Sequence, residues 1–224
     1  MFPYLRSVLS VLLASHLGAQ DAPRVEVPSA PNASCPIMGK KVSLPLFVDT
    51  ELGRIWVCCK PCFKKILANV PAAHQTAYPV VVDANNTTCP MTGTALGEPA
   101  VTLTLQSQRF RVCCSECATQ ARANSQLVLA KLAQPKLVDV GNTTCPVRGT
   151  KVAANTFVVV GDQIVHLADS KAVEVVKQTP RELLQKAIEL AKAQPPRPPH
   201  VPQPAPPPPM PGTPAAPAKP EGKQ

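Results

Sequence analysis

Three stretches of the sequence repeat one pattern: Asn32-Ala-Ser-Cys35-Pro-Ile-Met-Gly39, Asn86-Thr-Thr-Cys89-Pro-Met-Thr-Gly93 and Asn142-Thr-Thr-Cys145-Pro-Val-Arg-Gly149. The shared motif is N-x-[ST]-C-P-x-x-G, and its cysteines are 54 and 56 residues apart. Recurrence at a near-constant spacing is typical of tandem structural units. We therefore expect three copies of one small module, in residues 21–78, 79–134 and 135–193.

The three copies share one order of predicted elements. A short apolar segment precedes each motif, a β-hairpin follows it, and helical spacing of apolar residues ends the copy. The predicted first strands are 25–27, 80–82 and 137–140, and the predicted hairpins are 44–48 with 54–58, 101–105 with 109–113, and 157–160 with 163–167. The predicted helices are 60–69, 116–133 and 169–178, with a further one from Thr179-Pro180-Arg181-Glu182 to about residue 193. The expected fold class is α+β.

Both ends of the chain differ from the repeats. Residues 1–20 have one basic residue, an apolar run and then small residues, which predicts a signal peptide cleaved near Ala19 or Gln20 and a periplasmic or secreted protein. No later apolar run has the length of a membrane-spanning helix. Residues 194–224 hold 14 of the 28 prolines. Such a tail is expected to be a disordered spacer, or a ligand for a partner that recognises polyproline II segments.

The net charge of +9 comes from scattered Lys and Arg residues. No basic stripe alternates with aromatic residues, as an RNA-binding surface would need. Nucleic acid is therefore not an expected partner.

The nine cysteines are unevenly distributed among the copies. The first two copies carry four each, and the third carries Cys145 alone; the eight are Cys35, Cys58, Cys59, Cys62, Cys89, Cys113, Cys114 and Cys117. In both full sets a C-P-x-x-G turn is followed by C-C-x-x-C at a predicted strand-to-helix junction. The positive end of a helix stabilises thiolates, and thiolate clusters favour soft ions such as Zn(II) or Cu(I). All eight are candidate metal ligands.

This combination of C-P-x-x-G and C-C-x-x-C resembles the TRASH and YHS-type metal-binding modules, over residues 32–70 and 86–133, with a degenerate copy at 142–178. The resemblance implies treble-clef-like units associated with heavy-metal sensing, trafficking and resistance. The family pattern would use Cys35, Cys58 and Cys62, then Cys89, Cys113 and Cys117. A C-x-x-C grip would instead pair Cys59 with Cys62 and Cys114 with Cys117.

The third copy is expected to be structural. Aligning its strand with the others sets His166 opposite Cys113, and Cys145 with His166 is too small a ligand set for an ion. His74, after the first helix, is expected to be solvated. The asparagines before C-P fit glycosylation sequons, but their fixed place favours a local role in shaping the turn.

Two alternatives remain open. Cysteines of exported proteins often form disulfides, here Cys35 with Cys59 and Cys58 with Cys62, which would give a structural or interaction protein without metal. A C-x-x-C pair would also suit thiol-disulfide redox chemistry. The preferred interpretation is a non-enzymatic exported metal carrier, buffer or sensor, which could meet a metal transporter or another exported protein.

Overall fold

The computed structural model describes residues 23–28 and 30–194, and within them the chain is mixed α+β with six helices and three small sheets. The predicted signal peptide and residues 195–224 of the Pro-rich tail lie outside the described residues. No helix in the described ranges combines the length and hydropathy that a membrane crossing requires. The predicted α+β class is confirmed, and the treble-clef form of the modules stays a prediction.

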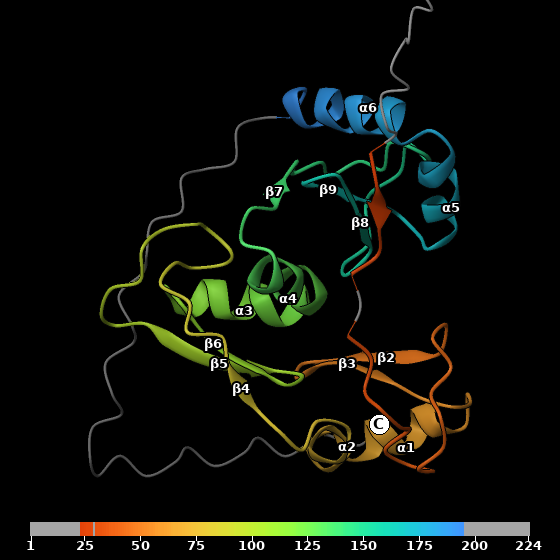
Figure 1. Cartoon of the computed structure of the whole chain (residues 1–224), viewed down its shortest axis with the longest axis vertical. Coiled ribbons are helices and arrows are strands. Elements are labelled where there is room, and N and C mark those ends of the chain that lie inside the picture. Colours follow the sequence, from red (N-terminus) through yellow and green to blue (C-terminus); the bar gives the residue numbers. More distant parts are fainter. Residues whose placement is uncertain (1–22, 29, 195–224) are drawn as a thin grey trace, which may run out of the picture.

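Each copy contributes a hairpin followed by two helices (Figure 1). The first has β2 (Phe47–Thr50), β3 (Gly53–Trp56), α1 (Cys62–Ala68) and α2 (Val70–Ala77). The second has β5 (Val101–Leu105), β6 (Gln108–Val112), α3 (Ser115–Ala123) and α4 (Ser125–Ala133). The third has β8 (Phe157–Val160), β9 (Gln163–His166), α5 (Lys171–Gln178) and α6 (Pro180–Lys192). The short strands before the motifs are β1 (Val25–Glu26), β4 (Val82–Asp83) and β7 (Val138–Asp139).

The three hairpins pair in the same register, which sets Phe47 opposite Trp56, Thr102 opposite Arg111, and Phe157 opposite His166. Trp56, Arg111 and His166 are therefore equivalent positions, at or next to the end of the second hairpin strand. This register allows the residues that follow to be matched copy by copy.

The helical region of every copy is broken at one equivalent position. The prediction of a single helix over 116–133 is wrong, because Asn124 leaves helical geometry between α3 and α4. The second helix of the first copy, α2, was not predicted. It begins after Asn69, whose side chain accepts a hydrogen bond from the Ala72 amide at 3.1 Å, as a helix N-cap does. Thr179 precedes α6 at the corresponding place.

The short strand before each motif pairs within its own copy in the second and third copies, but not in the first. β4 and β7 each lie parallel to the second hairpin strand of their copy, on β6 and β9. β1 instead pairs antiparallel with β8 of the third copy, with Val25 opposite Val160, giving the order β1-β8-β9-β7 (Figure 1). β8 has an open edge because β7 covers the other side of the hairpin, on β9. The N-terminal strand thus ties the start of the first copy to the last copy.

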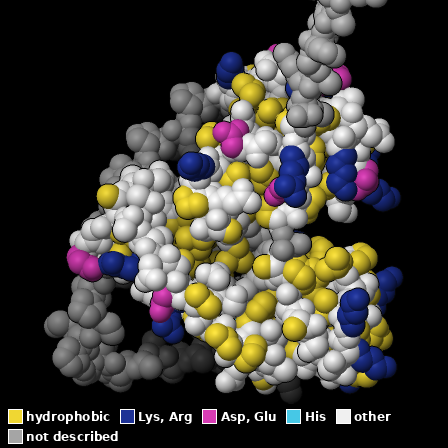
Figure 2. Space-filling view, viewed as in Figure 1, with side chains coloured by type: hydrophobic (Ala, Val, Ile, Leu, Met, Phe, Trp, Pro, Cys, Tyr) yellow, Lys and Arg dark blue, Asp and Glu magenta, His cyan; other side chains and the backbone are white. Residues whose placement is uncertain are grey.

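Each copy has its own small core, which contains the cysteine of its motif. A fourth cluster, which includes Leu127, Phe157 and Ile164, joins α4 to the third sheet. Figure 2 shows hydrophobic side chains on the visible face of the first-copy lobe, with Lys and Arg along its outer edge. Several apolar residues of the first copy, among them Leu44 and Leu67, are exposed.

A polar network joins the copies at the tips of two hairpins. Gln106 adopts a positive φ of 51° in the β5–β6 turn, and its amide donates to the Leu52 carbonyl at 2.8 Å. Its side chain is buried, donates to the Tyr78 hydroxyl at 2.9 Å and accepts from Gln126 at 2.7 Å. Satisfied buried polar groups of this kind fix one arrangement, because each unpaired group would be costly.

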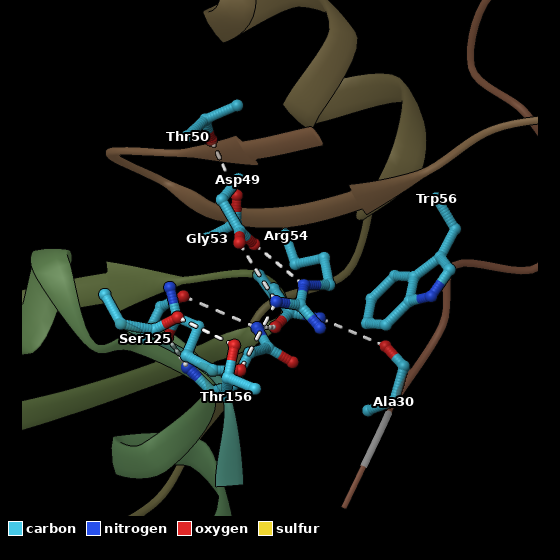
Figure 3. Close-up of polar contacts among 12 residues, drawn as sticks. Ala30, Asp49, Thr50, Gly53, Arg54, Trp56, Ser125 and Thr156 are labelled. Carbon is cyan, nitrogen blue, oxygen red and sulfur yellow. Dashed lines mark hydrogen bonds and ion pairs between the residues drawn. The ribbon is translucent and has the colours of Figure 1, made fainter. Parts of the chain in front are cut away.

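Arg54 extends this network from β3. It forms two hydrogen bonds with Asp49, at 2.7 and 2.9 Å, and its guanidinium lies 3.7 Å from the centre of the Phe47 ring. Figure 3 shows the Arg54 and Asp49 side chains facing each other. Arg54 also contacts the Asn155 carbonyl of the third copy at 3.5 Å. The Asn155 side chain accepts from the Gln126 amide at 3.0 Å, so residues of all three copies meet here.

Candidate metal centre

The C-P-x-x-G motifs form one closed turn in all three copies. The cysteine amide donates to the carbonyl one residue past the glycine, and the glycine amide donates back to the cysteine carbonyl, at 2.7–2.8 Å in every case. Gly39, Gly93 and Gly149 have φ of 65°, 74° and 70°. Glycine adopts this left-handed conformation without strain, which is why the motif ends in glycine.

The asparagine of each motif clamps this turn to the second hairpin strand. Asn32 accepts from the Trp56 amide at 2.8 Å and donates to the Trp56 carbonyl at 3.0 Å. Asn86 and Asn142 make the same pair of bonds to Arg111 and His166. The asparagine side chain therefore forms the two hydrogen bonds that a neighbouring β-strand would form with this residue. The expectation of a local role is confirmed, and these bonds occupy the amide nitrogen that a glycan would need.

The two clamped turns with full cysteine sets each face a helix start. Cys35, Cys58 and Cys62 form one group, and Cys89, Cys113 and Cys117 the other; in each, the Sγ atoms lie within 4.8 Å of one another. The Cys35–Cys62 and Cys113–Cys117 sulfur distances are 3.7 and 3.5 Å. A tetrahedral ion with bonds of about 2.3 Å would hold two sulfurs about 3.8 Å apart. Both triads could thus hold a soft ion.

The remaining two of the eight predicted ligands lie beside these triads. Cys59 Sγ is 3.5 Å from Cys62 Sγ and 3.8 Å from Cys58 Sγ. Cys114 is buried, and its Sγ accepts a hydrogen bond from the Cys117 amide at 3.4 Å, which caps α3. No two of the nine cysteines, all of which lie in the described ranges, form a disulfide, so the alternative pairs Cys35–Cys59 and Cys58–Cys62 are not present in the structure.

One thiol of each triad, Cys35 or Cys89, has a pKa below the ordinary value for cysteine. Burial alone would raise the pKa of Cys35, but hydrogen bonds from the backbone amides of Cys58, Ile37 and Met38 lower it to about 7. The pKa of Cys89 is lowered to about 7 in the same way. Burial, then the neighbouring thiols, raises the pKa of Cys62 to about 12, and that of Cys117 is raised as well. A bound cation would reverse these increases, because it favours the thiolate form.

The third copy keeps Cys145 but has alanines at the other two triad positions, with an ion pair beside them. The hairpin register sets Ala168 at the position of Cys58 and Cys113, Asp169 at that of Cys59 and Cys114, and Ala172 at that of Cys62 and Cys117. The alignment of His166 with Cys113 is therefore wrong by two residues. Arg148, from the turn, donates to Asp169 at 3.2 Å, and so joins the turn to the helix start.

The actual surroundings of His166 were not predicted. Its Nε2 lies 2.9 Å from Asp139 Oδ1, Lys131 lies 3.8 Å from the same carboxylate, and the three border a cavity of about 370 Å³ between the second and third copies. Burial would raise the pKa of Asp139, but His166 and Lys131 lower it. Asp139 lies in a short strand that reads as apolar, so no sequence signal marked it.

His74 also differs from its expected place. It lies on α2 and is buried rather than solvated, and its Nε2 makes no hydrogen bond within the described part of the chain. Its ring centre lies 5.3 Å from that of Tyr78, with the two ring planes tilted by 48°, next to the polar network at Gln106. Burial lowers the pKa of His74, an effect that the nearby backbones of Gln106 and Leu52 only partly offset.

Comparison with protein-family models, curated proteins and solved structures found no match for the chain. The assignment to the TRASH and YHS-type modules therefore stays a prediction. The argument for a function rests on the geometry of the two triads.

Proposed function

We propose that the protein is a soft-metal carrier, buffer or sensor that binds one Zn(II) or Cu(I) ion at each cysteine triad and catalyses no reaction. One observation carries the proposal: the copies that keep all their cysteines bring three sulfurs together at a helix start, whereas the copy without them has an ion pair there.

The small cores of the copies support the same proposal. A module of this size buries little apolar surface, and metal binding or contacts with neighbours usually supply the missing stability. The three copies share the polar network at Gln106, so they have neighbours, and the metal would add a link inside each of the first two. Loss of the ion is then expected to lower the melting temperature.

Metal analysis of the full chain, reconstituted with Zn(II) under reducing conditions, tests the proposal. We expect about two equivalents for the wild type, about one for Cys62→Ser or Cys117→Ser, and none for the double variant. Cys145→Ala, in the copy without a triad, is the matched control and should keep two. Cys58→Ser, at a half-exposed ligand, replaces Cys62→Ser if circular dichroism shows that variant unfolded. A folded wild type that binds no zinc or copper would overturn the proposal.

The site of action is part of the proposal. The sequence of residues 1–20 supports export to the periplasm or the outside of the cell. A transporter or another exported protein would then exchange metal with the triads, and the Pro-rich tail would act as a spacer or bind a partner that recognises polyproline II. Mass spectrometry of the exported protein should find an N-terminus near residue 20.

The C-x-x-C distance favours a second candidate function. The 3.5 Å between Cys59 Sγ and Cys62 Sγ would also suit a thiol pair that exchanges with disulfides. An insulin-reduction assay separates the two functions. Activity that is lost in Cys59→Ala and survives metal chelation would favour redox chemistry over metal binding.

A further inference from the structure

Five exposed lysines lie beside the triad of the first copy: Lys40, Lys41, Lys60, Lys64 and Lys65. The first two end the C-P-x-x-G turn, where the Lys40 carbonyl accepts from the Cys35 amide at 2.8 Å, and the other three lie next to Cys62 at the start of α1. The sulfurs of Cys35 and Cys62 are 3.7 Å apart, so folding brings lysines from residues 40–65 to one site. Within the described part of the chain, none of these five side chains forms an ion pair.

The other two copies do not carry this charge at the equivalent positions. The amides of Cys89 and Cys145 donate to Thr94 and Thr150, which are therefore equivalent to Lys40. Together with the hairpin register, this sets the five positions at Thr94, Ala95, Ser115, Thr119 and Gln120 in the second copy, and Thr150, Lys151, Ser170, Glu174 and Val175 in the third. The five positions have a net charge of +5 in the first copy and of zero in the second, and in the third Lys151 offsets Glu174.

Neither the thiols nor the fold accounts for the lysines. The second triad brings its three sulfurs together without them, so neutralising thiolates does not require them. Lys60 directly precedes the start of α1, an end that favours acidic side chains, so helix stability does not explain it. The acidic residues of the first copy, Asp49 and Glu51, lie at the hairpin tip, and Asp49 is paired with Arg54. The five lysines are thus available to a negative charge outside the chain.

Exposed apolar residues lie among these lysines. Met38, in the turn two residues before Lys40, is 49% exposed, and Leu67, three residues after Lys64 on the same side of α1, is 61% exposed. Figure 2 shows hydrophobic side chains on the first-copy lobe with Lys and Arg along its edge. Apolar surface rimmed by charge is typical of protein–protein interfaces.

We infer that this basic surface, defined by the five lysines, docks on the acidic surface of a partner protein that exchanges a soft ion with the first triad. The inference rests on the proposed metal binding and adds the chemistry of the partner. A protein can present thiolate or imidazole ligands beside its carboxylates, whereas a lipid headgroup offers only oxygen ligands, which compete poorly with thiolates for a soft ion. Attraction between the two surfaces speeds their association at low salt, and salt screens it.

Binding of labelled poly-L-glutamate to the full chain tests the docking without metal. The test variant takes the residues of the second copy: Lys40→Thr, Lys41→Ala, Lys60→Ser, Lys64→Thr and Lys65→Gln. The matched control loses the same charge, with glutamine in place of five exposed lysines of the third copy: Lys136, Lys151, Lys171, Lys186 and Lys192. At low salt we expect binding about 10-fold weaker or more in the test variant, and less than about 3-fold weaker in the control. Equal losses would mean that net charge alone binds the polymer, and would overturn the inference.

Vesicles of phosphatidylglycerol are the second probe for the same proteins. Vesicle binding that the test variant loses and the control keeps, without such a difference for polyglutamate, would assign the surface to a membrane and overturn the inference. If circular dichroism shows the test variant unfolded, Lys40→Thr with Lys41→Ala replaces it, because both positions lie in the exposed end of the turn.

Zinc transfer tests the exchange itself. The acceptors are a Cys-x-x-Cys peptide flanked by glutamates and the same peptide flanked by lysines, and the donor is the full chain with Cys89→Ser and Cys117→Ser, which keeps only the first triad. At low salt we expect transfer to the acidic peptide to be about 10- to 100-fold faster, and the two rates to agree within about 3-fold once the five lysines are replaced. If this donor fails to fold, the wild type should pass one of its two ions quickly to the acidic peptide and the other slowly. Equal rates to the two peptides would overturn the inference while two zinc equivalents still support the proposed function. A wild type that binds no zinc would overturn both.

Discussion

Arg148 and Asp169 form an ion pair, with Nε and Oδ2 3.2 Å apart, at the place where the other copies bring thiols together. Both side chains are 43% exposed, so solvent screens the pair and it adds little to stability. The relationship shows that the turn and the helix start are linked in the third copy too, by a positive charge that neutralises a carboxylate.

Restoring thiols should therefore create a third site. In the triple variant Arg148→Thr, Ala168→Cys and Ala172→Cys, the new thiols join Cys145, and the loss of the guanidinium removes the charge that would repel an ion. We expect the zinc content to rise from about two to about three equivalents. Arg148→Thr alone is the control and should bind two. A folded triple variant that still binds two would show that the third copy is no longer built like the others.

Loss of an asparagine clamp should destabilise the chain without any change in metal content. Asn142→Ala leaves the amide and carbonyl of His166 without their partner, which we expect to cost about 2 kcal/mol of the free energy of unfolding. Urea denaturation measures the change. Thr143→Ala, at an exposed neighbour, should alter stability by less than about 0.5 kcal/mol. A neutral Asn142→Ala would mean that the clamp is dispensable.

Acid should weaken the packing of His74 against Tyr78, beside the polar network at Gln106. Its pKa is lowered in the folded chain, so below the ordinary value of 6.5 the unfolded chain binds more protons than the folded one. The stabilising contribution is therefore complete above about pH 7 and is lost as the pH falls below 6.5. Urea unfolding at several pH values should show this loss in the wild type and a smaller loss in His74→Gln. Equal slopes would exclude His74 as the cause.

Gly53 is expected to tolerate no side chain. It has a φ of 105°, and a Cβ there would lie 2.8 Å from Gln106 Cγ in the neighbouring hairpin turn. Gly53→Ala should cost about 1–3 kcal/mol and loosen the contact between the first two copies. Thermal unfolding and limited proteolysis would detect both effects. Gly97→Ala, with open space and no positive φ, should behave as the wild type.

Much of this architecture could be predicted from local patterns. Residues 101–105 alternate apolar residues with threonine, and residues 157–160 include three consecutive valines. The structure has strands over these two ranges. Even the helix break that we missed has a sequence signature. Asn69, Asn124 and Thr179 are cap residues 55 residues apart, and proline follows within two residues in the first and third copies. In the second copy no proline follows Asn124, and the helical period of residues 116–133 runs across the break.

The candidate site was predictable only as a set of residues. The spacing of the motifs places eight cysteines at two turns. It does not show that Cys114 caps a helix or that the Cys59 sulfur lies near those of Cys58 and Cys62. Those positions depend on where each helix begins. Nor could the spacing place His166, whose equivalence to Trp56 follows from strand register. By sequence alone His166 aligns with Cys113, a candidate ligand, two residues away from its true equivalent, Arg111.

The sequence by itself determined the three copies, their hairpins and the eight candidate cysteines of the first two copies, because these depend on short-range pattern and spacing. Only the tertiary structure decided that β1 pairs with β8 of the last copy and that Gln106 joins the copies. A two-residue strand carries too little information to choose its partner. It pairs with whichever sheet edge the packed modules leave open, and that edge exists only once the chain has folded.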